Sequence, residues 1–407
     1  MKENRKGDIF MSLVNTPSGN RLHIGIFGKR NSGKSSLLNA ITGQEIALVS
    51  EVKGTTTDPV SKAMEIHPIG PCLLIDTAGF DDTGDLGNMR IEKTKAVLDK
   101  TDVAVVVFSD MQMELETQWI AMLRQRKIPI LAVVNQVDRI EQVQEIKRQI
   151  EQRFSLTPLL VSAKEKTGIS QMKHEILRLM PPDFEAQSLT GSLVQPEDVV
   201  LLVMPQDKQA PKGRLILPQV QTIRDLLDNH CVVMCVTTEQ LSNALQALEK
   251  PPKLIITDSQ AFAQVYPLKP AETLLTSFSI LLAAYKGDLS AFVKGANALD
   301  SLTDDSHVLI AEACTHAPLQ EDIGRVKIPN MLRKKYGEHL QVTVVSGSQF
   351  PKDLSEYQLI IHCGACMFNR KHVLTRVEQA EQQGVPITNY GVVLAKLTGI
   401  LDRISMQ

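Results

Sequence analysis

A short segment early in the chain carries glycine, lysine and serine at a spacing that suits phosphate binding. Residues 28–35 read Gly-Lys-Arg-Asn-Ser-Gly-Lys-Ser and match the pattern G-x-x-x-x-G-K-S between a predicted strand and a predicted helix. The glycines let backbone N–H groups surround a β-phosphate, the Lys34 ammonium lies between the β- and γ-phosphates, and the Ser35 hydroxyl binds Mg²⁺. The predicted contacts are Gly28, Asn31, Ser32, Gly33, Lys34, Ser35 and Ser36.

Three further motifs follow in order, each after a predicted strand. Asp76-Thr77-Ala78-Gly79 offers a carboxylate that can hold Mg²⁺ through water and a glycine N–H that can meet the γ-phosphate. In Asn135-Gln136-Val137-Asp138, Asn135 can brace the loops, and the Asp138 carboxylate can accept from guanine N1–H and N2–H₂. Ser162-Ala163-Lys164 can place the Ala163 N–H against guanine O6. Because adenine lacks the donor pair that Asp138 would read, the motifs predict a GTP site.

Cysteines and histidines form a second candidate site near the end of the sequence. Cys314-Thr315-His316 follows one predicted strand, and His362-Cys363-Gly364-Ala365-Cys366 closes another. Because neighbouring parallel strands end at the same edge of a sheet, we expect the two pieces to meet. Three chemistries fit the spacing: a tetrahedral zinc site, a redox dithiol of Cys363 and Cys366, or an iron–sulfur cluster on three thiolates with an exchangeable fourth ligand.

Short apolar runs alternate with helical segments throughout the chain, which favours parallel α/β sheets covered on both faces. The predicted strands are Leu22–Phe27, Cys72–Asp76, Val103–Phe108, Ile130–Asn135, Leu159–Ser162, Val199–Met204, Val232–Val236, Leu254–Thr257, Val308–Ala311, Val342–Val345 and Leu359–His362. The Pro-, Ser- and Gly-rich stretch at 181–197 is a predicted linker. The helices predicted after it include Gln221–Asn229, Glu239–Glu249, Pro270–Tyr285 and Leu289–Leu299.

These elements predict three domains. A nucleotide-binding domain spans 1–180, a small α/β dimerisation domain spans 181–268, and a domain with the Cys/His site spans 269–407. The middle domain is near the lower size limit for an independent core, and such a domain often completes its core by pairing with a copy of itself.

The composition of the chain argues against several classes of function. The chain has 407 residues, 43% of them hydrophobic and 22% charged, and a net charge of −2. No half of the chain is strongly basic, so we do not expect a nucleic-acid partner. The apolar runs are shorter than the ~20 residues that span a bilayer, and the N-terminus does not read as a signal peptide. We therefore expect a cytoplasmic protein with no membrane partner.

The four nucleotide motifs resemble those of the Ras-like P-loop GTPases over residues 22–180. Gly54-Thr55-Thr56 and Asn31 resemble the TrmE–Era–Der branch, in which the second threonine, here Thr56, closes over Mg²⁺ and the loop asparagine helps to bind K⁺. Two departures stand out. Gln136 replaces the usual lysine, so we expect weaker nucleotide binding. Phe80 replaces the water-orienting glutamine, so we expect slow intrinsic GTP hydrolysis, at a rate that potassium or a partner would raise.

The combination of this GTPase module with the Cys/His motif resembles the FeFe-hydrogenase maturation GTPases (the HydF family) over the whole chain. The segments Ala210–Gln219 and Gly54–Pro59 share that resemblance. The resemblance implies a Ras-like GTPase domain followed by two smaller α/β domains, a homodimer, and a 4Fe-4S cluster held by Cys314, Cys363 and Cys366. It also implies that His316 or His362 is a fourth ligand or an outer hydrogen-bonding group.

The same resemblance implies the cellular role. Members of the family hydrolyse GTP and act as a scaffold and carrier on which radical-SAM maturases assemble a diiron precursor, which is then delivered to apo FeFe-hydrogenase. The alternative is a ribosome- or tRNA-associated GTPase with a structural zinc site. The charge balance argues against that alternative, because no basic patch with interleaved aromatic residues is present and aromatic residues are only 4% of the chain.

Overall fold

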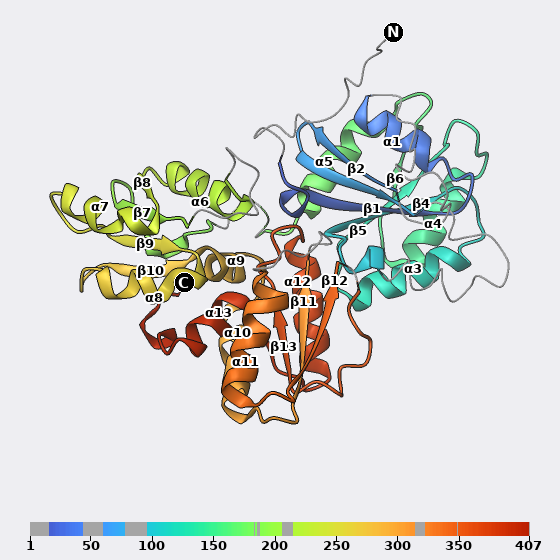
Figure 1. Cartoon of the computed structure of the whole chain (residues 1–407). Helices are drawn as coiled ribbons and strands as arrows, with labels where there is room; N and C mark the ends of the chain where they lie inside the picture. The colour runs from blue at the N-terminus through green and yellow to red at the C-terminus, as the bar shows by residue number, and fades with distance from the viewer. Residues whose placement is uncertain are drawn as a thin grey trace, which may run out of the picture. The chain divides into compact units, whose positions relative to one another are not determined.

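The structure is a computed structural model that describes residues 16–43, 60–77, 96–182, 184, 188–205, 215–313, 322–347 and 349–406. The chain forms two compact units, Met1–Pro181 and Pro182–Gln407. The described residues form one β-sheet in the first unit and two in the second, with helices packed against them (Figure 1). The predicted α/β class is therefore confirmed.

The first unit is built on a six-stranded sheet in the order β2-β3-β1-β4-β5-β6. Its strands are β1 (Leu22–Gly28), β2 (Val60–Ile66), β3 (Gly70–Asp76), β4 (Val103–Phe108), β5 (Ile130–Val134) and β6 (Leu159–Leu160). Its helices are α1 (Lys34–Thr42), α3 (Glu114–Gln125), α4 (Val143–Phe154) and α5 (Ile169–Leu179). Every residue of β1 and of β4 is buried, as expected for central strands covered on both faces.

One strand of this sheet departs from the prediction. The five strands from β3 to β6 in the sheet order are parallel, but β2 pairs with β3 in the antiparallel sense. Only three residues separate β2 from β3, so the two strands form a hairpin and must run in opposite directions. The five predicted strands are therefore parallel, and β2 is an additional antiparallel edge strand that was not predicted.

The second unit contains two four-stranded sheets, and all their strands are parallel. The first has the order β10-β9-β7-β8, with β7 (Val199–Val203), β8 (Val232–Val236), β9 (Leu254–Thr257) and β10 (Leu274–Ser277). The helices that accompany it are α6 (Leu217–Asp228), α7 (Leu241–Ala247), α8 (Phe262–Val265) and α9 (Phe278–Lys286).

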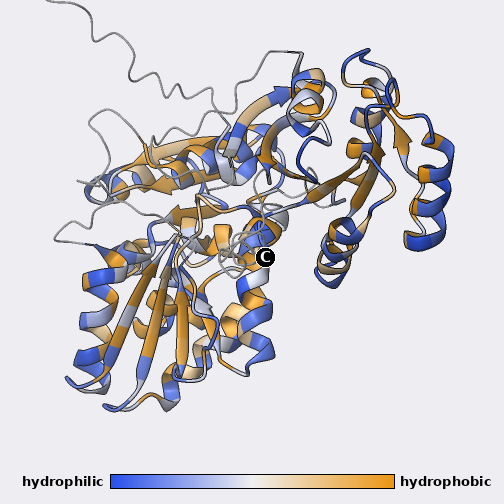
Figure 2. Cartoon of the chain, turned by 90° about the vertical axis from the view of Figure 1, so that its right-hand side faces the viewer, coloured by the Kyte–Doolittle hydropathy of each residue, from blue (hydrophilic) through white to orange (hydrophobic). Residues whose placement is uncertain are grey.

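The other sheet of the second unit has the order β12-β11-β13-β14. Its strands are β11 (His307–Glu312), β12 (Gln341–Ser346), β13 (Leu359–His362) and β14 (Ile387–Asn389). Its helices are α10 (Leu289–Ala296), α11 (Ile328–Tyr336), α12 (Arg370–Gln382) and α13 (Tyr390–Leu397). Figure 2 shows that the strands are mostly apolar and that polar residues concentrate on the outer faces of the helices.

The helix predicted over Pro270–Tyr285 is wrong in its first half. Residues Leu274–Ser277 form β10, which pairs with β9 and completes the first sheet of this unit, and the helix begins only at Phe278. The Ser277 hydroxyl accepts a hydrogen bond from the Ile280 N–H and so caps that helix. A short apolar run does not distinguish strand from helix, and pairing with β9 decides the matter.

The two sheets of the second unit share one hydrophobic core. A single cluster of buried residues includes Leu201 and Ile255 from the first sheet and Leu309 and Ile360 from the second. The boundary predicted at residue 268 precedes β10, which belongs to the first of these sheets. Among the described residues, none of the helices is both long and apolar enough to cross a bilayer.

Candidate functional site

The phosphate loop turns sharply between β1 and α1. Gly33 has a φ of 82°, in the left-handed region, and a Cβ there would lie 2.4 Å from the Asn135 Nδ2 atom, so a side chain is excluded. The buried Lys34 ammonium donates hydrogen bonds to the Gly28 and Lys29 carbonyls. The ammonium is thus held inside the loop, where a nucleotide places its β- and γ-phosphates.

The remaining residues of the loop lie around this turn. Ser35 and Ser36 are exposed in the first turn of α1, and Asn31 is exposed with a φ of 63°. The buried Ser32 hydroxyl has no hydrogen-bond partner among the described residues. A buried donor of this kind at the N-terminus of a helix is suited to an anionic ligand.

Asp76 lies beside the phosphate loop because β3 pairs with β1. Its register partner is Ile26, and the following Thr77 donates from Oγ1 to the Ile26 carbonyl at 2.6 Å. Asp76 is buried, so its carboxylate is held close to the end of β1. Two residues predicted to act with it, Thr56 and Gly79, lie outside the described residues.

Asn135 joins the guanine-binding motifs to the phosphate loop. This buried side chain donates from Nδ2 to the Ser32 carbonyl at 3.0 Å and to the Gly33 carbonyl at 3.3 Å. Its Oδ1 atom accepts from the Ala163 N–H at 3.2 Å. The Asn135 amide therefore links its own loop to the phosphate loop and to the loop after β6.

The carboxylate that would read guanine is held by a neighbour. Asp138 is exposed, and its Oδ1 atom accepts a hydrogen bond of 2.6 Å from the Ser162 hydroxyl. This hydrogen bond lowers the pKa of Asp138. The group therefore stays an acceptor, the form that two guanine donors require. Lys164, predicted in the same motif, is exposed beside Glu165.

Gln136 has a role that its sequence position did not indicate. Its Nε2 atom donates to the Asn31 carbonyl at 2.9 Å, so it ties the guanine-binding loop to the phosphate loop. The shorter side chain therefore retains a link between the two loops although it lacks a lysine stem.

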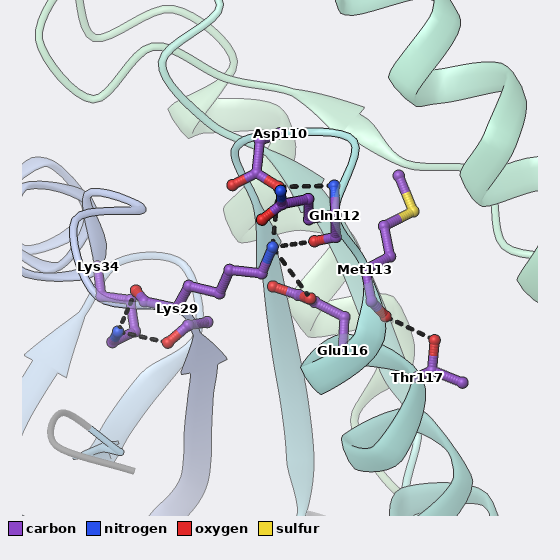
Figure 3. Close-up of polar contacts among 8 residues, drawn as sticks. Lys29, Lys34, Asp110, Gln112, Met113, Glu116 and Thr117 are labelled. Carbon is purple, nitrogen blue, oxygen red and sulfur yellow. Dashed lines mark hydrogen bonds and ion pairs between the residues drawn. The ribbon is translucent and has the colours of Figure 1, made fainter. Parts of the chain in front are cut away.

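Lys29 links the phosphate loop to the segment that follows β4 (Figure 3). Its ammonium lies 2.8 Å from Asp110 Oδ1 and 3.9 Å from Glu116 Oε2, and it donates to the Gln112 carbonyl. Glu116 is buried in the first turn of α3, and burial raises its pKa to about 7 although Lys29 acts in the opposite direction. No motif in the sequence indicated this contact, because the three partners of Lys29 lie about 80 residues away.

The end of the segment that leads into the first piece of the Cys/His motif contacts the second piece at the sulfur of Cys363. β11 and β13 are parallel neighbours with Ala311 opposite His362. The Cys363 Sγ atom accepts hydrogen bonds from the Ala313 N–H at 3.0 Å and from the Ala365 N–H at 3.4 Å. Ala313 directly precedes Cys314. The two N–H donors favour a thiolate at Cys363, as thiolate ligation of a metal would require, although burial acts in the opposite direction and outweighs them.

Part of the predicted metal site lies outside the described residues, namely Cys314 and His316. Within the described part of the chain, no group of three or more His, Cys, Asp or Glu side chains is placed to share a metal ion. Cys363 and Cys366 are both partly buried, and burial raises the pKa of the Cys363 thiol to about 11.

Both ring nitrogens of His362, the residue before Cys363, form hydrogen bonds. Its Nε2 atom lies 3.0 Å from Arg376 Nη1, and its Nδ1 atom lies 2.8 Å from the Cys363 carbonyl. A guanidinium only donates, so Nε2 accepts and Nδ1 carries the proton that is donated to Cys363. Burial and the adjacent guanidinium lower the pKa of His362 to about 3, so the imidazole is neutral.

Arg376 itself is enclosed by aromatic rings. Its guanidinium carbon lies 4.8 Å from the centroid of Phe350 and 4.7 Å from that of Phe368, and the side chain is buried. These cation–π contacts hold the guanidinium against His362.

Lys286, the last residue of α9, lies under the same loop. Burial lowers the pKa of this lysine to about 8, and negative charge on Cys366 and Cys363 would act in the opposite direction. The pattern C-x-x-C did not indicate this partner, which lies on α9, the helix that follows β10 of the other sheet in the second unit.

Comparison with known proteins divides the chain into three matched segments. A family model described as a 50S ribosome-binding GTPase matches residues 23–136. The model of the hydrogen maturase F dimerization domain matches residues 189–287, and that of the hydrogen maturase F tetramerization domain matches residues 290–406.

Curated relatives match part of the chain. The chain is 33% identical over 172 residues to GTPase Der of Wolinella succinogenes, a match that covers 39% of this chain and 36% of the relative. It is 38% identical over 162 residues to the tRNA modification GTPase MnmE of Bordetella petrii, covering 39% of this chain and 33% of the relative. The chain thus spans about a third of the length of these curated relatives.

Among solved structures, a tyrosine-to-alanine variant of Aquifex aeolicus Era bound to GDP and AlF₄⁻ has a TM-score of 0.34 and 19% identity. That match covers 53% of this chain and 92% of Era.

The Glu116 contact predicts a pH-dependent stability of the first unit. The pKa of Glu116 is higher in the folded chain than in the unfolded chain, so the unfolded chain ionises first as the pH rises from about 4.5 to about 7. The free energy of unfolding should therefore fall across that window, by an amount on the order of 2–3 kcal/mol between pH 5 and pH 8. In the Glu116→Gln variant this decrease should be absent.

Trp119, the single tryptophan of the chain, is buried one turn away in α3, so its fluorescence in urea reports unfolding of this unit. The exposed Glu114→Gln on the same helix is the control and should keep the pH dependence of the unchanged chain. Parallel pH profiles for the chain with and without Glu116→Gln would contradict the role assigned to Glu116.

Proposed function

Because the chain belongs to the hydrogen maturase F family of GTPases, we propose that it hydrolyses GTP and carries an iron–sulfur cluster in hydrogenase maturation. The observation that carries this proposal is the presence of both hydrogen maturase F domains, at 189–287 and 290–406, behind a Ras-like P-loop GTPase domain. On this proposal the protein is the cytoplasmic scaffold and carrier on which radical-SAM maturases build the diiron precursor of FeFe-hydrogenase.

The nucleotide chemistry is proposed for the first unit. Lys34 would neutralise the β- and γ-phosphates, Asp138 would select guanine, and Asn135 would keep both loops in register for the nucleotide. Mg²⁺, held by Ser35 and Thr56 with Asp76 acting through water, would offset the charge of the phosphates. Gly79 would contact the γ-phosphate. The hydrogen bonds of Asn135 to Ser32, Gly33 and Ala163 support this arrangement.

The cluster is proposed for the second unit. Cys314, Cys363 and Cys366 would hold a 4Fe-4S cluster, and the two N–H donors at the Cys363 sulfur support thiolate ligation there. The lone pair of His362 faces Arg376, which favours an orienting role for His362 over direct ligation. His316 remains the candidate for an exchangeable fourth ligand.

Self-association is proposed to begin at the edge of the first sheet of the second unit. β8 is an edge strand in the described sheet, and it exposes 57% of Val232, while 55% of Leu227 is exposed on the preceding helix α6. Exposed apolar side chains on an edge strand favour pairing with another chain. The dimerization-domain match covers both residues and supports a homodimer through this edge. Apo FeFe-hydrogenase would then be the recipient of the precursor.

The nucleotide site is tested by two substitutions. Lys34→Ala removes the charge between the phosphates, and Asp138→Asn replaces the guanine acceptor with a group that also donates; each should lower GTP hydrolysis by ~100-fold or more. Iron content after anaerobic reconstitution should stay unchanged, because the two sites lie in different compact units. Arg148→Ala, at an exposed position of α4, is the control. Loss of iron in either variant would show that the sites are not separable.

Potassium dependence tests the proposed role of Asn31. Hydrolysis measured at equal ionic strength should be several-fold faster in KCl than in NaCl, because a potassium ion near the phosphates would stabilise the developing charge. Asn31→Ala should abolish that difference. Equal rates in the two salts would remove potassium from the mechanism.

The cluster is tested by iron analysis and EPR spectroscopy after anaerobic reconstitution and reduction. Cys314→Ala, Cys363→Ala and Cys366→Ala should each lose most of the iron and the EPR signal, because no neutral side chain replaces a thiolate ligand. GTP hydrolysis should persist. Cys235→Ala, an exposed cysteine outside the motif, should bind iron normally.

The histidines separate the possible ligand sets. His316→Ala and His362→Ala should alter the EPR signal more than the iron content, since water can replace a weak fourth ligand. Complete loss of iron from either variant would indicate a closed site with a histidine ligand. Stoichiometric zinc without iron would instead favour a ribosome- or tRNA-associated GTPase with a structural zinc site.

A further inference from the structure

Lys286 is a buried cation whose hydrogen bonds all go to one loop. Only 1% of its surface is exposed, although it is the last residue of α9. Its Nζ atom donates to the backbone carbonyls of Phe368 at 2.8 Å, Cys366 at 3.1 Å and Ala365 at 3.4 Å. A lysine ammonium has three donors, so this loop takes up its full hydrogen-bonding capacity.

A second cation makes the reciprocal connection. Arg370, at the start of α12, donates from Nη1 to the carbonyl of Tyr285 at 3.0 Å and to that of Gly287 at 2.9 Å. These carbonyls flank Lys286 in the chain. The C-terminal end of α9 and the loop 363–370 are therefore joined in both directions.

Apolar packing closes the same contact. Cys366 packs against the hydrophobic cluster that contains Leu281 and Leu282 of α9, with Tyr285 packed beside it. A Cβ on Gly364 would lie 3.8 Å from Leu282 Cδ1, so the loop lies directly over the helix at this point. The loop with the C-x-x-C motif thus rests on a helix that follows β10, a strand of the other sheet of this unit.

A buried ammonium is costly unless hydrogen bonds and nearby negative charge compensate it. The three carbonyl dipoles supply part of that compensation. Thiolates at Cys363 and Cys366 would supply the rest, because both side chains are close enough to Lys286 to interact with it electrostatically. A thiolate-bound cluster is anionic, whereas two neutral thiols are not, so the position of Lys286 suits the metal-loaded loop.

We propose that Lys286 is the positioning residue of the C-x-x-C loop: its ammonium fixes the shape of the loop through three carbonyls and compensates the negative charge of a cluster bound there. The role rests on the proposed iron–sulfur site. It also makes α9 the element through which the part of the second unit that matches the dimerization domain contacts the C-x-x-C loop.

Two substitutions separate the two parts of this role. Lys286→Met has a side chain of similar length without charge or donors, and Lys286→Gln keeps donors without charge. The exposed Lys294→Met on α10 removes the same charge elsewhere and is the matched control. Circular dichroism and gel filtration establish whether each full-length variant is folded.

The first measurement uses the protein without metal. Hydrogen–deuterium exchange of the peptide that spans residues 363–370 should be about tenfold faster in Lys286→Met than in the unchanged chain or in Lys294→Met, because three carbonyl contacts are lost. Lys286→Gln should lie between them. Unchanged exchange in a folded Lys286→Met variant would overturn the positioning role, whatever the protein binds.

The second measurement follows anaerobic reconstitution with iron and sulfide. An EPR-monitored titration should give a more negative reduction potential for both Lys286→Met and Lys286→Gln, since a lost positive charge destabilises the reduced cluster. Lys294→Met should leave the potential unchanged. If Lys286→Met does not fold, Lys286→Gln alone decides, and a potential equal to that of the unchanged chain would overturn the charge role.

The two proposals fail in different ways. If the unchanged chain binds no iron, the iron–sulfur function is wrong, and the exchange measurement still decides whether Lys286 holds the loop. If the unchanged chain binds iron but neither variant differs from it in exchange or potential, the iron–sulfur function stands and Lys286 is only a buried core residue.

Discussion

Parallel pairing of the central strands is the constraint on which each candidate site depends. Parallel strands end at one edge of their sheet, so residues far apart in the sequence meet there. β1 and β3 bring the phosphate loop next to Asp76, and β11 and β13 bring Ala313 onto the sulfur of Cys363. A one-residue slip would turn these side chains to the opposite face. The apolar burial that fixes strand register therefore also fixes the chemistry.

Donors that reach in from other elements hold the loops at these edges. Asn135 joins three loops in the first unit, and Lys29 joins the phosphate loop to the start of α3. In the second unit, Arg376 orients His362 from α12, and Lys286 supports the C-x-x-C loop from α9. The Lys286 ammonium and the Asn135 Nδ2 atom donate to backbone carbonyls, so these two bridges restrain the path of the chain whichever side chains the loop displays.

The two sheets of the second unit share one hydrophobic core. Buried residues of both sheets pack in one cluster, and α9 ends directly beneath the cysteine loop. The β8 edge, where we propose that two chains associate, and the loop proposed to hold the cluster therefore belong to one packed unit.

The sequence by itself determined the α/β class, the order of the nucleotide motifs and most central strands, because these depend on local spacing and on apolar runs. It also predicted that Asn135 braces its loops. It did not determine that Leu274–Ser277 is a strand, since a short apolar run suits either conformation and only pairing with β9 decides. Nor did it reveal the partners of Gln136, Lys29 or Lys286. Those contacts join residues about 80 to 105 positions apart, and only the tertiary structure brings such residues within hydrogen-bonding distance.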